Sequence, residues 1–487
     1  MQFQRTTLYK IFIGVFLVLQ NFTLAEAADI ESTIELDKST NIVRVEGRFT
    51  ADSRISNKKN LGFLAAASGI SGLGKRVSEL KLFGASGKPV AFRKLLDGEY
   101  LADSEFASWE YTVDLSANSN SIVAAHVSWL TDENGILMLD DLLPQFVAGK
   151  ESVSASVTLS NRADWSAASG AEATGKSPLL LNDYRKGVIY VGKEIRNHQA
   201  VIKGRSVNLT FSGNWHFTDQ EATAMTEQVI AKLAATFGSI SDGGIRIGIF
   251  KFPIQVNPGS WEAETRGNSV TIISSDMPFR SQSLQRLHEQ LRHELFHLWM
   301  PNGMLLTGNY AWFYEGFALY NSLKMAVELK RITFDDMLDT LSRAYQIDVR
   351  QKPRRPLVET SSNFVGRADT ATYARGMLIA FLLDVELMRT SNGRSNIASM
   401  LGKIYSANRT IADGNTFVLN AIGENSVMSK YVKGVETIDT ADIATQSGLV
   451  FENSDGFKIL AKPNGRQREI LSNLSYNTWR SSNRIKK

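Results

Sequence analysis

The sequence predicts a multidomain protein in which a β-rich N-terminal domain precedes an α+β, mainly helical domain. The chain has 487 residues, of which 43% are hydrophobic, enough to form two or three cores. Its hydrophobic pattern has a period of two residues up to about position 188 and becomes mainly helical after about position 280. We therefore expect domains at 28–188 and 189–450, followed by a basic C-terminal tail at 451–487.

Composition excludes several classes of protein. There is no cysteine, so disulfide scaffolds, Cys-ligated zinc, iron–sulfur clusters and thiol nucleophiles are all excluded. The formal net charge of +4 gives no reason to expect a nucleic-acid partner. Any bound metal must be held by His, Asp, Glu or backbone oxygen.

The first 27 residues are typical of a signal peptide. Arg5 and Lys10 precede a short apolar stretch at 11–19, and Ala25-Glu26-Ala27 fits a signal-peptidase site. We expect cleavage after Ala27 and export, to the periplasm in a Gram-negative bacterium and otherwise by secretion. An uncleaved anchor is the alternative, but no membrane span is expected after cleavage.

The region 28–188 is predicted to be β-sandwich-like. Three segments, at 32–49, 78–95 and 108–130, each suggest two strands joined by turn residues. His126, His198 and His216 lie in strand or turn contexts, and we interpret them as structural.

The second domain is expected to begin with a small α/β sheet. Residues 218–238 form an amphipathic pattern, with Thr218 as N-cap, Glu221 three residues later and Gly238 at the C-terminal end. From about residue 281 to 434 the pattern is mainly helical.

A helix predicted at 283–300 carries two histidines one turn apart. Its leucines form one stripe, and His293 and His297 lie on the opposite side at positions i and i+4. Two imidazoles in this arrangement can chelate one Zn2+, and Glu294 between them can act as a general base. The alternative is that both histidines are ordinary residues of an amphipathic helix.

A catalytic zinc needs a third protein ligand, and Glu315 is the candidate. It lies in a second predicted helix at 311–323, after a turn at 301–309, so it can return to the two histidines. A Glu near a helix start can also simply be stabilised by the helix dipole. Its aromatic neighbours make an uncompensated carboxylate costly, however, and a metal would remove that cost.

The motif HELFHLW followed by WFYEGFALY resembles the gluzincin metallopeptidases, in which HExxH and a downstream Glu bind zinc. The chain is most similar to the glycyl aminopeptidase family, relatives of aminopeptidase N, over roughly 190–450. Segments 372–387 and 431–449 share the resemblance. It implies a thermolysin-like catalytic domain and one Zn2+ per chain, bound by His293, His297 and Glu315.

The resemblance also implies roles for other residues. Glu294 would be the general base, and Tyr373 would donate a hydrogen bond to the oxyanion of the tetrahedral intermediate. Glu262, in a segment that matches the family's Gly-rich strand loosely, would bind the substrate's α-ammonium, with Glu264 as its rival.

These observations predict zinc-dependent hydrolysis of peptides, with aminopeptidase action on exported or periplasmic peptides as the main hypothesis. A zinc endopeptidase would use the same metal site without an ammonium anchor. A non-enzymatic binding protein on a peptidase scaffold is the third hypothesis, although the expected ligands and general base are all present.

Overall fold

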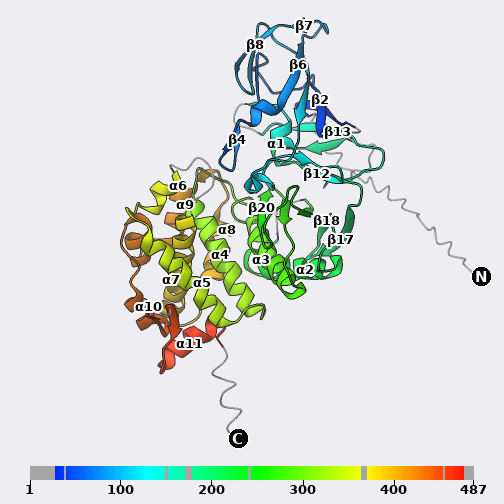
Figure 1. Ribbon diagram of the computed structural model, residues 1–487. Helices are drawn as coiled ribbons and strands as arrows, with labels where there is room; N and C mark the ends of the chain where they lie inside the picture. Colours follow the sequence, from blue (N-terminus) through cyan, green and yellow to red (C-terminus); the bar gives the residue numbers. More distant parts are fainter. Residues whose placement is uncertain are drawn as a thin grey trace, which may run out of the picture.

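The computed structural model describes residues 28–37, 40–148, 152–169, 178–239, 243–362, 370–452 and 456–476. The predicted signal peptide at 1–27 lies outside these residues. Figure 1 shows a β-rich region at the top, an α/β region at centre right and a helical region at lower left. Within the described part of the chain, no helix combines the length and the apolar character needed to cross a bilayer.

The N-terminal region is built on a seven-stranded sheet. Its strands in spatial order are β15 (Leu179–Leu181), β13 (Ala155–Ser160), β1 (Ile30–Leu36), β2 (Ile42–Phe49), β10 (Ser108–Asp114), β6 (Val77–Phe83) and β7 (Pro89–Val90). Alternate residues of β1 are buried, which confirms the period-two pattern. β1 and β2 pair antiparallel, as predicted.

Smaller sheets complete the N-terminal region. One has four strands, β11 (Trp129–Leu130), β12 (Asn134–Met138), β16 (Val188–Gly192) and β14 (Ser166–Ser169), and another has three, β3 (Asn60–Gly62), β9 (Glu99–Ala102) and β8 (Phe92–Leu96). A short hairpin joins β4 (Ala66–Ala67) to β5 (Ile70–Ser71). Val45 and Val113 of the large sheet share one core with Leu137 and Val191 of the four-stranded sheet. The expected β-rich architecture is confirmed.

One predicted strand in this region is wrong. The second half of the segment 108–130 forms the 3-10 helix η2 (Ser121–Val123) and a turn, and only Trp129–Leu130 is a strand. The Asn120 side chain accepts a hydrogen bond from the backbone N–H of Ile122, which favours a helical start over an extended chain. The turn places His126 away from the N-terminal core.

Two further 3-10 helices and one short helix lie in the N-terminal region: η1 (Leu73–Arg76), η3 (Tyr184–Lys186) and α1 (Leu139–Leu142).

A five-stranded sheet opens the second region. Its order is β17 (Arg196–Ile202), β18 (Arg205–Phe211), β19 (Ile245–Lys251), β21 (Ser269–Ser274) and β20 (Trp261–Arg266). β16 still pairs with β12 and β14, so the sheets change between residues 192 and 196, slightly later than the predicted boundary at 188/189. Tyr190 of β16 joins the two regions, since its hydroxyl contacts the carbonyl of Val270 and the hydroxyl of Thr271.

Helices α2 (Asp219–Phe237) and α3 (Arg280–His297) share their hydrophobic core with this sheet. The predicted capping of α2 is confirmed: the Thr218 hydroxyl accepts from the Glu221 N–H and the Glu221 carboxylate accepts from the Thr218 N–H. Gly238 follows with a φ of 81°, which favours glycine.

The helical region follows α3. It contains α4 (Ala311–Glu328), α5 (Phe334–Arg350), α6 (Leu357–Ser362), α7 (Thr370–Thr390), α8 (Ile397–Ala407), α9 (Gly414–Ile422), the π-helical turn η4 (Met428–Lys433) and α10 (Thr440–Ser447). Two-residue strands β22 (Leu306–Thr307) and β23 (Ala412–Asp413) pair with each other. At the contact between α4 and α7, a Cβ on Gly316 would lie 2.4 Å from the backbone carbon of Gly376. The two helices therefore touch through their backbones beside Glu315.

The segment predicted as a solvated basic tail is folded over much of its length. β24 (Leu449–Glu452) and β25 (Gly456–Ile459) form a hairpin, and α11 (Gly465–Asn473) follows. Ile470, Leu471 and Leu474 are buried in the helical core. Burial of these three residues explains why the prediction of a tail is wrong, because the basic side chains lie between apolar side chains that pack in the core. Residues 477–487 lie outside the described part.

Candidate metal centre

Helix α3 positions both histidines of the HExxH motif. Leu287, Leu291 and Leu295 are buried in the core, whereas Leu284 at the start of the predicted stripe is only partly buried. Because these leucines fix the orientation of the helix, His293 and His297 are turned to the opposite side. The predicted helix and its leucine stripe are therefore confirmed.

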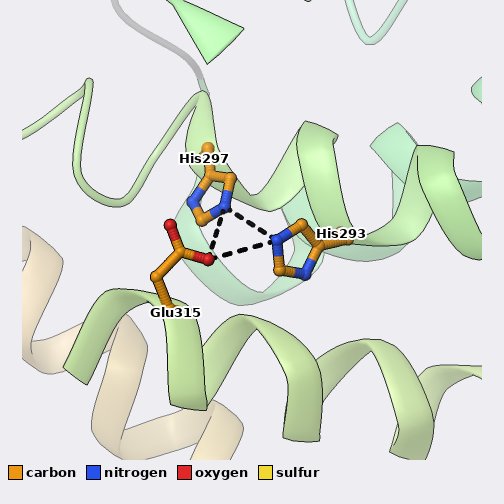
Figure 2. Close-up of side chains that lie close together, drawn as sticks. All are labelled: His293, His297 and Glu315. Atoms are coloured by element: carbon orange, nitrogen blue, oxygen red, sulfur yellow. Dashed lines mark hydrogen bonds and ion pairs between the residues drawn. The ribbon is translucent and has the colours of Figure 1, made fainter. Parts of the chain in front are cut away.

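Helix α4 brings Glu315 to the two imidazoles, as Figure 2 shows. Glu315 Oε2 lies 3.3 Å from His293 Nε2 and 3.6 Å from His297 Nε2, and the two Nε2 atoms are 3.2 Å apart. A tetrahedral zinc with ligand bonds near 2.1 Å separates its ligand atoms by about 3.4 Å. The cluster therefore has the dimensions of a three-ligand zinc site.

The orientation of His297 also fits a metal ligand. Its Nδ1 lies 2.9 Å from the carbonyl oxygen of Met300, which can only accept a hydrogen bond. The proton of the neutral ring must therefore be on Nδ1, which leaves the lone pair of Nε2 directed at His293 and Glu315. Two histidines and one carboxylate are also the ligand set of a catalytic zinc site with an open position.

The charges of the cluster are strongly coupled in the metal-free protein. Burial by itself would lower the pKa of His297, but the Glu315 carboxylate outweighs it and raises that pKa to about 9. Burial likewise opposes ionisation of Glu315, and the two imidazoles overcome it and hold its pKa well below the usual range. The site therefore attracts one positive charge, which a proton or a cation can supply.

Glu294 lies beside the cluster and is held in place by β20. It is 4% exposed, and the Thr265 hydroxyl lies 2.9 Å from its Oε2. The hydroxyl also lies 3.0 Å from the Glu294 backbone carbonyl. A carboxylate so held can move a proton without first reorienting.

A cavity of about 690 Å³ opens over these groups. It is lined by every residue predicted for the site: Glu262, His293, Glu294, His297, Glu315 and Tyr373. Tyr373 comes from α7, three residues before the glycine that contacts α4. The close α4–α7 packing thus brings the Tyr373 helix to the same cavity as Glu315.

The two candidate ammonium anchors both lie on β20, at the edge of the five-stranded sheet. Glu262 and Glu264 are two residues apart and both line the cavity. Glu264 is engaged by other charges: Arg266 Nε lies 2.8 Å away and His126 Nδ1 lies 2.8 Å away. Burial raises the pKa of a carboxyl, but Arg266 and His126 outweigh it and lower the pKa of Glu264.

His126 is a cavity residue that the sequence analysis treated as structural. It lines the cavity and contacts Glu264 across 138 residues of sequence. Its neighbours in the sequence give no local signal for this, because the contact depends on the turn after η2 and on the packing of two separate regions. His198, by contrast, is bonded to Asp219 and does not line the cavity.

Two buried arginines near the cavity differ in their partners. Arg375 makes two hydrogen bonds, of 2.9 and 3.1 Å, to the Asp348 carboxylate and so forms half of an ion pair. Arg292, immediately before His293, lines the cavity and bonds only to neutral groups of Ser322 and His288. Burial lowers the pKa of Arg292 to about 10.

Comparison with known proteins shows what the fold is similar to. No family model matches the sequence, and no curated protein matches it significantly. Among solved structures, an aminopeptidase N family protein from Idiomarina loihiensis has a TM-score of 0.69 at 13% identity, over 90% of this chain and 82% of that one. An M1 zinc metallopeptidase from Deinococcus radiodurans has a TM-score of 0.53 at 16% identity, over 85% and 94%.

A variant of the Deinococcus radiodurans enzyme bound to a Tyr-Ser-Ala substrate matches similarly, with a TM-score of 0.52 at 16% identity, over 85% of this chain and 95% of that one. These matches agree with the β-rich N-terminal region, the five-stranded sheet and the helical region described above. The chain therefore has the fold of the M1 zinc metallopeptidases, which confirms the expected gluzincin fold. The narrower resemblance to the glycyl aminopeptidase family stays a prediction.

Proposed function

We propose that the protein is a zinc-dependent peptidase that removes residues from the free amino end of peptides. The observation that carries this proposal is the convergence of His293, His297 and Glu315 at zinc-ligand spacing, beside a carboxylate held for proton transfer. One Zn2+ per chain fits this cluster. When bound there, zinc lowers the pKa of water and polarises the scissile carbonyl.

The protein's own groups carry the proton. Thr265 donates to Oε2 of Glu294, which leaves Oε1 to take the proton of the attacking water. Glu294 then gives this proton to the leaving amine as the C–N bond breaks. The buried position of Glu294 keeps competing bulk water from this transfer.

Tyr373 is proposed to stabilise the oxyanion. A tyrosine hydroxyl is neutral at pH 7, so it donates a hydrogen bond without adding charge to the ground state. Tyr373 lines the cavity that the cluster also lines, which supports this role. The peptide found in the Deinococcus radiodurans neighbour supports peptides as the substrate class.

Recognition of the free amino end is assigned to Glu262. Glu264 already faces Arg266 and His126, so its charge is compensated within the protein. β20 is an edge strand, and its free side can pair with an extended substrate backbone. A zinc endopeptidase remains the second candidate, because the metal cluster and Glu294 would serve it equally.

Glu294→Gln separates an enzyme from a binding protein on the same scaffold. The zinc content should stay near one per chain, since Glu294 is not a ligand, while hydrolysis of Ala-Ala-Ala falls by about 10³-fold or more because the base is lost. Metal analysis and peptide hydrolysis measure the two effects. Near-normal turnover by this variant would remove the assignment of Glu294.

Blocked peptides separate the two peptidase classes. An aminopeptidase should cleave Ala-Ala-Ala and leave N-acetyl-Ala-Ala-Ala intact, because the acetyl group removes the ammonium. Equal cleavage of both peptides would favour the endopeptidase.

We also propose that the protein works after export, on exported or periplasmic peptides. The charged start, short apolar stretch and Ala25-Glu26-Ala27 site support this. Mass spectrometry of the mature protein should find Ala28 at its N-terminus, and recovery of the intact Met1 form would contradict cleavage.

A further inference from the structure

The cavity contains a buried positive charge that the proposed catalytic steps do not use. Arg292 is 4% exposed and lines the cavity next to His293. Its guanidinium donates from Nε to the Ser322 carbonyl at 2.9 Å and from Nη1 to His288 Nδ1. Within the described part of the chain, no carboxylate forms an ion pair with Arg292, although burial of an unpaired charge is costly.

Two other largely enclosed arginines, both in the second half of the fold, have carboxylate partners. Arg375 pairs with Asp348, and Arg266 pairs with Glu264 and Asp140. Arg292 is as enclosed as Arg375 and more enclosed than Arg266, but no described carboxylate pairs with it. Arg162 in the N-terminal region is also buried without a described carboxylate partner, but it donates to two backbone carbonyls and does not line this cavity. The fixed hydrogen bonds of Arg292 hold its guanidinium in one position, which favours a ligand site over a mobile surface charge.

The acids nearest to Arg292 are engaged elsewhere. Glu289, one turn earlier on α3, makes a 2.8 Å ion pair with Arg286. Glu294 is held by Thr265, and Glu315 by the two imidazoles. Among the described residues, Glu289 therefore acts on Arg292 only at longer range, and no carboxylate forms an ion pair with its guanidinium.

The two walls of the cavity also differ in charge. Its β20 wall carries the carboxylates of Glu262 and Glu264, whereas Arg292 lies with residues of α4 and α5. The cavity around Arg292 is lined by Leu319, Ser322, Leu323 and Thr340. Glu289 also lines this side, and its carboxylate is paired with Arg286. A cavity acidic on one side of the zinc cluster and basic on the other complements a substrate with a positive and a negative end.

We propose that Arg292 binds a carboxylate of the peptide substrate, either the C-terminal carboxylate of a short peptide or an acidic side chain next to the cleaved bond. The inference rests on the proposed peptidase function and adds a substrate class to it. Guanidinium and carboxylate form two parallel charge-assisted hydrogen bonds, so the preference for the anionic substrate is large.

Three matched peptide pairs test this with the unaltered zinc-loaded protein. Ala-Ala-Ala against its C-terminal amide probes the terminal carboxylate. Ala-Glu-Ala-amide against Ala-Gln-Ala-amide and Glu-Ala-Ala-amide against Gln-Ala-Ala-amide probe the two side-chain positions. We expect one carboxylate-bearing peptide to exceed its neutral partner by about 10- to 100-fold in kcat/KM.

Variants assign the preference to Arg292. Arg292→Gln should reduce the ratio within the preferred pair to about 1, whatever the remaining total activity, and Arg292→Lys should keep part of it. Arg280→Gln is the matched control, since it removes an arginine from the same helix at a position outside the cavity lining, and its partner Glu221 lies on α2. It should leave the ratio unchanged.

A binding measurement makes the test independent of turnover. Calorimetric titration of zinc-loaded Glu294→Gln protein with the preferred peptide and its neutral partner should show the same order of affinity, and adding Arg292→Gln should remove it. Cleavage of all peptides without any difference within the three pairs would overturn the Arg292 proposal and leave the peptidase intact. A difference in kcat/KM within the preferred pair that persists in the Arg292→Gln variant would also overturn it. If the unaltered protein hydrolyses none of the peptides, the peptidase function itself is contradicted.

Discussion

Two clusters of partly buried charge meet at the same cavity, one lining it with all three members and the other with His126 and Glu264, and they differ in how far their charges are satisfied. The metal cluster consists of His293, His297 and Glu315, whose ligand atoms all lie within 4.8 Å of one another. The β20 cluster consists of His126, Asp140, Glu264 and Arg266. In it, Arg266 forms ion pairs with both carboxylates and donates a hydrogen bond to the His126 carbonyl, so each acid has a cationic partner in direct contact.

From this difference we expect the chemistry at the metal cluster and a structural role for the β20 cluster. In the metal cluster two imidazole nitrogens lie 3.2 Å apart beside a carboxylate, an arrangement that gains most from a shared cation. In the β20 cluster each acid already has a cationic partner, and the contacts join the N-terminal region to the edge strand. Replacing a carboxylate by its amide should therefore lower zinc affinity in the metal cluster and the free energy of unfolding in the β20 cluster.

Glu315→Gln should have the largest effect. The amide keeps the shape of the side chain but removes the negative charge, so we expect zinc affinity to fall by about 100-fold or more and peptide hydrolysis by about 10³-fold or more. Competition with a chromogenic chelator measures the affinity. Glu328→Gln, on the same helix, changes only a pair with Lys232 and should leave both quantities unaltered. Full zinc binding by the Glu315→Gln protein would remove Glu315 from the ligand set.

Glu264→Gln should have a smaller and different effect. It leaves Arg266 and His126 without their carboxylate partner. Because these side chains are partly exposed, we expect the free energy of unfolding to fall by only about 2 kcal/mol. Zinc content should stay unchanged. Urea denaturation of the zinc-loaded protein measures the change. If the variant instead keeps its stability and loses cleavage of free-amine peptides, Glu264 and not Glu262 binds the ammonium.

The metal cluster was predictable because its ligands lie on two consecutive helices. Periodicity places His293 and His297 on one side of α3, and the turn after the motif limits where Glu315 can go. In the structure the three side chains do meet, with Glu315 Oε2 at 3.3 and 3.6 Å from the two Nε2 atoms, and their role as zinc ligands stays a prediction. The sequence also carried a signal for the folded C-terminal segment, since Asn464 and Gln467 form a capping box before Ile470. The excess of basic residues concealed this signal.

The β20 cluster was not predictable from local pattern. Arg266 and the His126 carbonyl are 140 residues apart, and they meet only because a β-rich region packs on the edge of another sheet. The residues around His126 suggested a strand, and the cap at Asn120 replaced it with a 3-10 turn. Likewise, nothing in the order of residues tells that Arg375 has a carboxylate partner and that Arg292 lacks one. Long-range packing decides both.

The pH dependence of the metal-free protein should show the smallest effect and sharpen the same contrast. His297 has a pKa near 6.5 when unfolded and about 9 in the folded metal-free cluster, because Glu315 outweighs the effect of burial. The stability that protonated His297 contributes is therefore complete below about pH 6.5 and is lost as the pH rises through 9. For this tightly coupled pair, the loss is on the order of 2 kcal/mol.

Urea denaturation of the chelator-treated protein between pH 6.5 and 9.5 measures that loss. The chain has no cysteine, so no thiol titrates in this range. The zinc-loaded protein should lose much less stability over the same range, because a cation replaces the proton whose loss destabilises the cluster. The β20 cluster is present in both forms, so it cancels in the comparison. Equal pH profiles with and without zinc would show that the two imidazoles and Glu315 do not share one positive charge, and the distinction between the two clusters would fail.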